Sequence, residues 1–173
     1  MTCRTLVSLL LFVLCSNLFA QQQVEKQQWS LDVLLPGVTY EVGLSKKTTL
    51  NANLGFGFGL RGGGQNTEYG IYPTGILQYR YYYNFQRRLD KGKRIARNTG
   101  NYLSPLVAYT SGEPILGDYQ INEGGFVGLA YGLQRTGRKG FQWNFLFGPG
   151  IDFEGEFALI INFKLGFVLG KNK

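Results

Sequence analysis

The chain has 173 residues, a length that suits one domain, and its 18 lysines and arginines outnumber 11 acidic residues to give a net charge of +7. It contains no histidine, which excludes Ser-His-Asp hydrolysis and His-ligated metal sites. The 25 glycines and the aromatic fraction of 15% both exceed the usual share, as is typical of a barrel with aromatic residues outside and tight packing inside.

Residues 1–20 have the order of a secretory signal peptide. Arg4 precedes an apolar run from Leu6 to Leu14, and Ala20 supplies the small residue expected before a cleavage site. A buried N-terminal helix is the alternative, but it does not account for this order of charged, apolar and small residues. After this segment no apolar run is long enough for a transmembrane helix.

Both cysteines, Cys3 and Cys15, lie inside the predicted signal peptide, so the mature chain is predicted to have no disulfide and no thiol chemistry. The mature chain would begin with residues 21–28, which are polar and poor in apolar side chains. We expect them to form a short periplasmic lead before the folded domain, which we place at residues 29–170.

Apolar and polar residues alternate from Trp29 onward, which is typical of a strand with one apolar face. The apolar positions change phase at Pro36-Gly37, between one run that ends at Leu35 and a second that begins at Val38. A single strand with a bulge would explain this change. A tight hairpin in which Leu35 pairs with Val38 would also explain it.

The stretch from Thr48 to Arg61, TTLNANLGFGFGLR, shows the clearest alternation in the chain. One face carries only Leu, Ala and Phe, and the other carries Thr, Asn, Gly and Arg. The run is longer than a typical globular strand of about 5–6 residues. Small polar residues suit a crowded barrel interior and bulky apolar residues suit lipid, so we interpret it as a membrane-spanning strand.

Similar alternation predicts the later strands, which we place at Tyr69–Phe85, Asn101–Thr110, Asn122–Gln134, Phe141–Phe153 and Phe157–Leu169. With a hairpin at Pro36-Gly37 the total is about eight, which agrees with the even strand numbers of bacterial outer-membrane barrels. Even parity also places several aromatic residues near the periplasmic strand ends, where we expect an aromatic girdle: Trp29, Tyr83, Phe85, Tyr102, Trp143 and Phe167. The predicted fold is therefore all-β, a closed antiparallel transmembrane β-barrel.

The order of segments resembles a known class of proteins. YEVGLSKKTTLNANLGFG forms a strand, turn and strand, and RYYYNF runs into the basic QRRLDKGK and then NTGNYL. This pattern is similar to uncharacterised outer-membrane families and to the small OmpA/OmpX-type barrels of Gram-negative bacteria. The resemblance implies contact with outer-membrane lipid and with the barrel assembly machinery. Such barrels tend to end on an aromatic residue, whereas here Phe167 is followed by VLGKNK.

Five charged residues fall on the predicted inner face: Asp32, Glu41, Arg80, Asp152 and Lys164. A buried charge without a partner costs several kcal/mol, so these residues are expected to pair. We expect a network of Arg80 with Glu41, and of Lys164 with Asp32. A structural plug of ion pairs is the simpler interpretation, because eight strands leave room only for side chains. A narrow ion path is the alternative.

The segment Gln86–Gly100 is rich in positive charge, with Asp90 as its single acidic residue. Its basic residues are Arg87, Arg88, Lys91, Lys93, Arg94 and Arg97. The segment lacks the interleaved aromatic residues of a single-strand nucleic-acid platform, so no nucleic-acid partner is expected. We expect a solvated periplasmic loop or short helix, with anionic head groups or a periplasmic protein as the alternative partner.

Gly57, Gly59 and Gly62 match the spacing G-x-G-x-x-G. A dinucleotide site needs that motif between a strand and a helix, whereas here it lies within a strand and GGGQNTE follows. The sequence therefore predicts no cofactor and no metal site.

The expected function is that of a small non-enzymatic outer-membrane barrel, for envelope integrity or surface interaction. A secreted lipocalin-like barrel with a small apolar ligand inside is the alternative. A lipid-modifying outer-membrane enzyme is less well supported because the chain has no histidine.

Overall fold

The computed structural model describes residues 23–63 and 66–170. The predicted signal peptide over residues 1–20 and its cleavage site lie outside these ranges, as do Gln21 and Gln22 at the start of the predicted lead.

Within the described residues, one antiparallel sheet contains nine strands. These are β1 (Gln27–Asp32), β2 (Gly37–Gly43), β3 (Thr48–Gly63), β4 (Asn66–Tyr81), β5 (Gly100–Thr110), β6 (Leu116–Gly117), β7 (Gly124–Thr136), β8 (Phe141–Asp152) and β9 (Phe157–Leu169). The short helix α2 (Phe85–Asp90) follows β4.

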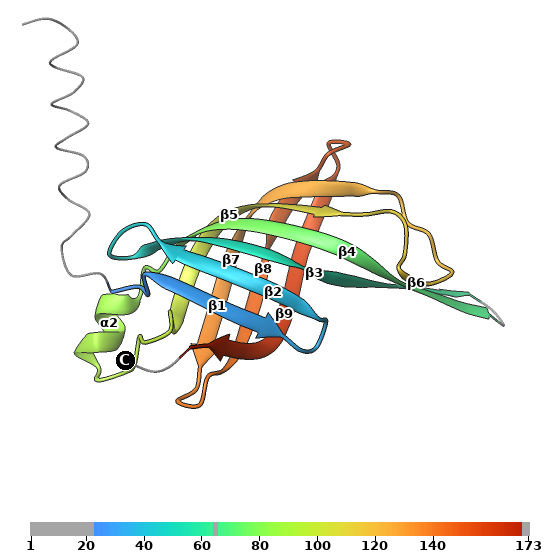
Figure 1. The fold of residues 1–173 in the computed structure, drawn as a ribbon. Helices are drawn as coiled ribbons and strands as arrows, with labels where there is room; N and C mark the ends of the chain where they lie inside the picture. Colours follow the sequence, from blue (N-terminus) through green and yellow to red (C-terminus); the bar gives the residue numbers. More distant parts are fainter. Residues whose placement is uncertain (1–22, 64–65, 171–173) are drawn as a thin grey trace, which may run out of the picture.

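The hydrogen bonds of the sheet run in a ring through eight of these strands. The order is β3-β2-β1-β9-β8-β7-β5-β4, and pairing of β3 with β4 completes the ring. The two-residue β6 adds to the outer part of β4 by pairing with Gly70 and Ile71. The prediction of an all-β antiparallel fold with about eight strands is confirmed. The start of β1 and the end of β9 lie on the same side of the ring as α2 (Figure 1).

A hairpin joins β1 to β2, but its turn is not where the sequence placed it. The turn occupies residues 33–36, and Leu31 lies opposite Val38. Leu35, predicted to pair with Val38, lies in the turn. Four turn residues preserve the phase of the two strands, so Leu31 and Val38 both face outward. Pro36 has no N–H to donate to a ladder, which suits it to the turn rather than to either strand.

The outer surface of the ring is apolar. Each of the eight ring strands exposes at least one large hydrophobic side chain, for example Leu31, Val38, Leu54, Leu77, Leu103, Leu129, Phe147 and Ile161. Leu54 is 72% exposed and Leu129 is 66% exposed. The alternation predicted from the sequence therefore places large apolar residues outside, while the interior holds polar residues together with buried apolar ones such as Leu106, Leu146 and Ile160. No helix in the described ranges is both long and apolar enough to cross a membrane.

An aromatic cluster fills the interior at the α2 end. Tyr82, Phe85 and Tyr102 are completely buried, and the Tyr82 ring stacks on that of Phe85 with centroids 4.6 Å apart. The predicted aromatic girdle is therefore wrong for Phe85 and Tyr102. β4 ends at Tyr81, and the chain then turns into α2, which carries Phe85 inward.

The other residues of the predicted girdle lie on the outside of the ring. Trp29, Tyr83 and Phe167 are exposed, and Trp143 is partly exposed.

Part of the predicted periplasmic lead belongs to the folded domain. Val24 is buried in the same cluster as Tyr82 and Phe85, and β1 begins at Gln27. Residues 23–28 therefore belong to the folded domain.

Gly132 makes room for one of the buried rings. It pairs with Tyr102 across β5 and β7, and a Cβ atom at Gly132 would overlap the Tyr102 ring. We predict that Gly132→Ala lowers the free energy of unfolding by about 1–3 kcal/mol, as overpacking in a filled interior does. Urea unfolding of detergent-refolded protein measures this. Gly124→Ala is the matched control, because a Cβ there meets nothing within 4 Å; equal midpoints for the two variants would contradict the prediction.

Candidate functional site

Polar side chains line the interior of the ring. They come from the inward-facing positions of the strands and are almost fully buried: Ser30, Thr39, Glu41, Thr49, Asn51, Asn53, Gln78, Arg80, Ser104, Gln134, Gln142 and Asn144. Hydrogen bonds offset the loss of water when polar groups are buried; most of these side chains make one, whereas both polar side-chain atoms of Asn51 have no partner among the described residues. The interior is therefore organised by its hydrogen bonds.

Arg80 is the centre of this network. Its Nη1 donates to Glu41 Oε2 at 3.2 Å and to Gln134 Oε1 at 2.9 Å, while its Nε donates to Gln78 Oε1 at 2.9 Å. The guanidinium also lies over the Tyr102 ring, 4.6 Å from its centroid. Three acceptors and an aromatic face thus surround a single buried cation.

Glu41 is balanced by more than its contact with Arg80. Its Oε1 accepts hydrogen bonds from the hydroxyls of Thr49 at 2.6 Å and Tyr82 at 2.8 Å. With both oxygens engaged, the carboxylate has neither an unpaired charge nor a free acceptor that would make its burial costly.

Lys164 and Asp32 form a second, looser pair. Their Nζ and Oδ2 atoms are 3.8 Å apart, which is an ion pair beyond hydrogen-bond distance. Asp32 Oδ2 accepts hydrogen bonds from Asn53 Nδ2 at 2.9 Å and Thr39 Oγ1 at 3.2 Å. Lys164 Nζ is buried and has no hydrogen-bond partner among the described residues.

The structure thus brings together four of the five predicted interior charges, in the two predicted pairs. Asp152 does not join them, so that part of the predicted network is wrong. It is the last residue of β8, and its Oδ1 accepts the backbone N–H groups of Glu154 and Glu156 in the following turn. A carboxylate at a strand end can satisfy turn amides more readily than it can reach the interior.

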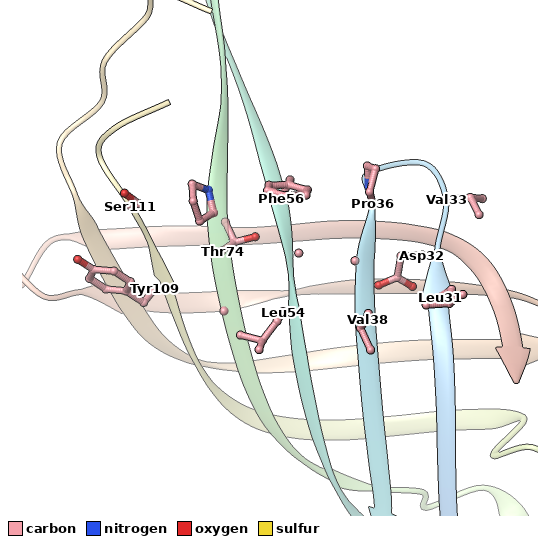
Figure 2. A pocket seen from close by; sticks show the side chains of 14 residues that line it. Leu31, Asp32, Val33, Pro36, Val38, Leu54, Phe56, Thr74, Tyr109 and Ser111 are labelled. Carbon is pink, nitrogen blue, oxygen red and sulfur yellow. The ribbon is translucent and has the colours of Figure 1, made fainter. Parts of the chain in front are cut away.

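Two small cavities are lined in part by Lys164. One, of about 10 Å³, is shared with Asp32, Thr39, Arg80 and Gln134, and another, of about 30 Å³, extends towards Phe56. The polar interior is therefore nearly filled by side chains. A much larger open groove of about 800 Å³ lies across β1 to β5 and is lined in part by Val33 and Pro36 of the β1–β2 turn (Figure 2).

The predicted basic segment covers the opposite end of the ring. Arg87, Lys91, Lys93 and Arg94 are exposed on and just after α2. Arg88 folds back, and its guanidinium donates to the Arg94 carbonyl at 2.9 and 3.0 Å. Partial burial, and then the positive charge of Arg135, lower the pKa of Arg88, but a guanidinium remains charged at any physiological pH.

Arg97 differs from the other five basic residues because it joins the segment to the ring. Its backbone N–H donates to Glu25 Oε1 at 2.8 Å, and its carbonyl accepts the hydroxyl of Thr136 at 3.2 Å. The neighbouring Asn98 is fully buried, and its Oδ1 accepts the Glu25 N–H at 2.8 Å. Segment and lead together therefore close this end of the interior.

The uncharged side chains of the network were not predicted from the sequence. Gln78, Tyr82, Gln134 and Asn144 contribute most of the hydrogen bonds around Arg80 and Tyr102. Their alternation with apolar residues was the available signal, since it places them inside. Among the described residues there is no group of three or more His, Cys, Asp or Glu side chains that could hold a metal ion.

Comparison with protein-family models, with curated proteins and with solved structures found no match for this chain.

We predict that Arg80→Met destabilises the protein by about 3–5 kcal/mol, because it leaves Glu41 buried without its counter-ion. The urea midpoint of detergent-refolded protein measures the loss. Arg87→Met, at an exposed position, is the control and should have little effect. The double variant Arg80→Met/Glu41→Gln should recover part of the loss; an Arg80→Met midpoint equal to that of the wild type would show that the network contributes nothing.

We predict that Glu25→Ala loosens the segment that closes the α2 end, because the Arg97 N–H loses its acceptor. Limited trypsin digestion of the refolded protein should then cleave faster after Arg94 and Arg97. Glu113→Ala, an exposed carboxylate in the segment between β5 and β6, should leave the rate of cleavage unchanged. Equal rates in both variants would mean that Glu25 does not hold the segment.

Proposed function

We propose that this protein is a small, non-enzymatic outer-membrane β-barrel of the Gram-negative envelope, with an interior closed by ion pairs, and that it serves envelope integrity or surface interaction. The observation that carries the proposal is the distribution of polarity. Every ring strand exposes large apolar side chains, while charged and amide side chains are buried inside. Soluble monomers rarely expose a contiguous apolar surface of this kind, whereas lipid requires one.

The filled interior supports a structural role rather than conduction. Arg80, Glu41, Gln78 and Gln134 occupy the interior of the ring, and the adjoining cavity is about 10 Å³. The lead, α2 and the buried Asn98 cover one end. An ion would have to displace this network to pass, so we favour the plug over the narrow ion path.

The alternative of a lipocalin-like carrier needs the opposite polarity. Such a barrel places apolar residues inside and polar residues outside. Here the outer surface is apolar, and the residues around the cavity of about 10 Å³ include Asp32, Arg80, Gln134, Asn144 and Lys164, which do not suit an apolar ligand. No feature of the described residues specifically favours the alternative of a lipid-modifying enzyme.

The exposed basic residues of α2 suggest how the barrel is oriented. The segment that carries Arg87, Lys91, Lys93 and Arg94 is joined through Arg97 to Glu25, just before β1, and to Gly170, just after β9. In our proposal this end faces the periplasm, where the four cations contact anionic lipid head groups or a periplasmic partner.

Heat-modifiable gel migration tests the proposal. We predict that the mature protein refolded in detergent migrates differently before and after boiling, because a closed ring resists unfolding until it is heated. In cells the protein should fractionate with the outer membrane. Arg80→Met is a useful comparison, since its shift should occur at a lower temperature. A soluble periplasmic protein without a shift would overturn the proposal.

A further inference from the structure

The wall of the ring is not equally high all the way round. β2 pairs with β3 only as far as Gly55, and β1 pairs with β9 only from Gly166 to Leu169. Beyond the turn at residues 33–36, residues 56–63 of β3 pair only with β4, and residues 157–164 of β9 pair only with β8. We call this break in the ladder the gap. Figure 1 shows that β3 and β4 extend well beyond the end of the β1–β2 hairpin.

The gap has to lie where polar groups can reach it. Unpaired backbone N–H and C=O groups are not tolerated in hydrocarbon, because nothing there can satisfy them. The side chains along its edges are nevertheless apolar: Phe58 is 56% exposed, Phe157 75% and Ile161 63%. In the membrane location proposed above, this combination would place the gap at the boundary between acyl chains and head groups, on the side away from α2.

An apolar groove on the outer surface reaches the edge of the gap at Phe56. It is lined by Leu31 of β1, Val38 of β2, Leu54 and Phe56 of β3 and Tyr109 of β5, whose side chains are labelled in Figure 2. Its volume is about 800 Å³, enough for a long acyl chain.

The groove adjoins the interior cavity of about 30 Å³. Asp32, Gly55, Phe56 and Thr74 line both of them. The wall is thin at this level, because Gly37 and Gly55 face each other across β2 and β3 and neither carries a side chain. An apolar path outside the ring therefore meets a polar cavity inside it.

Lys164 gives that cavity a positive charge that is incompletely matched. Its partner Asp32 is already stabilised by Asn53 and Thr39, whereas Lys164 Nζ is buried without a hydrogen-bond acceptor among the described residues. A buried ammonium gains most from an anionic acceptor at hydrogen-bond distance.

We propose that the gap binds a long-chain fatty acid, with its carboxylate at Lys164 in the interior cavity and its acyl chain in the outer groove. The cavity accommodates a carboxylate but not a glycerophosphate head group, since about 10–15 Å³ open to the centre of a water-sized sphere holds one water molecule and the cavity measures about 30 Å³. This inference rests on the membrane location proposed above, because the groove would receive its ligand from the lipid phase.

The test uses the refolded full mature chain in phosphatidylcholine vesicles, with 16-doxylstearate and its methyl ester as spin-labelled probes. The immobilised fraction of each probe is titrated by electron paramagnetic resonance. We expect the acid to saturate near one site per protein and to bind about tenfold more tightly than the ester, as one charge-assisted hydrogen bond predicts. Unlabelled palmitate should displace it.

Variants separate the two parts of the site. Lys164→Met should abolish the preference for the acid, and Lys164→Arg should retain it. Gly75→Leu should weaken both probes, because Gly75 lines the groove and a Cβ there makes only an ordinary contact with Leu54. Gly62→Leu is the control, because Gly62 lies on the same β3–β4 hairpin and a Cβ added there meets nothing within 4 Å.

Two results would overturn the inference: equal binding of acid and ester to the wild-type protein, or an unchanged preference for the acid in Lys164→Met. If Lys164→Met does not fold, the comparison of acid with ester and the Gly75→Leu variant still decide. Boiled and unboiled samples of each preparation are run on a gel. A retained shift without saturable binding refutes the ligand site alone, whereas loss of the shift in the wild-type protein refutes the membrane barrel.

Discussion

Arg80 carries a positive charge in a place that bulk water does not reach, and three side chains from different parts of the ring satisfy it. Glu41 comes from β2, Gln134 from β7 and Gln78 from β4 itself. β2 and β7 are not neighbours in the sheet, so the guanidinium links walls that no backbone ladder joins. Any shift of β4 by one residue would turn Arg80 outward and leave Glu41 unpaired, which makes the network a check on strand register.

The two ends of the ring are built differently. At the α2 end, buried Phe85 and Asn98 and the hydrogen bonds of Glu25 close the interior. At the other end, the short β1–β2 hairpin leaves the edges of β3 and β9 without partners there. In the proposed membrane location, a sealed end and an open side would let the protein exchange molecules with the membrane rather than across it, as the proposed ligand site requires.

Alternation of side chains predicted most of this fold, because one apolar and one polar face is a property of each strand by itself. It placed Glu41, Arg80, Asp32 and Lys164 inside, and their charge then required pairing. What it could not predict depends on neighbouring elements. Phe85 lies inside because α2 turns it there, and Asp152 serves its own turn because the strand ends at that point. The position of the β1–β2 turn depends on the register with β9 and β3, which one strand's pattern does not contain.

Pairing of β1 with β9 has a consequence for the order of assembly. These are the first and last strands along the described chain, and Trp29 to Asp32 meet Gly166 to Leu169 only when everything between them is in place. The β3–β4 ribbon is a local contact and can form early, whereas this seam has the largest loop to close. Until then the sheet is open, and the backbone N–H and C=O groups along the free edges of β1 and β9 have no partners. The assembly machinery that the resemblance implies would therefore mainly have to shield these two edges until β1 and β9 pair.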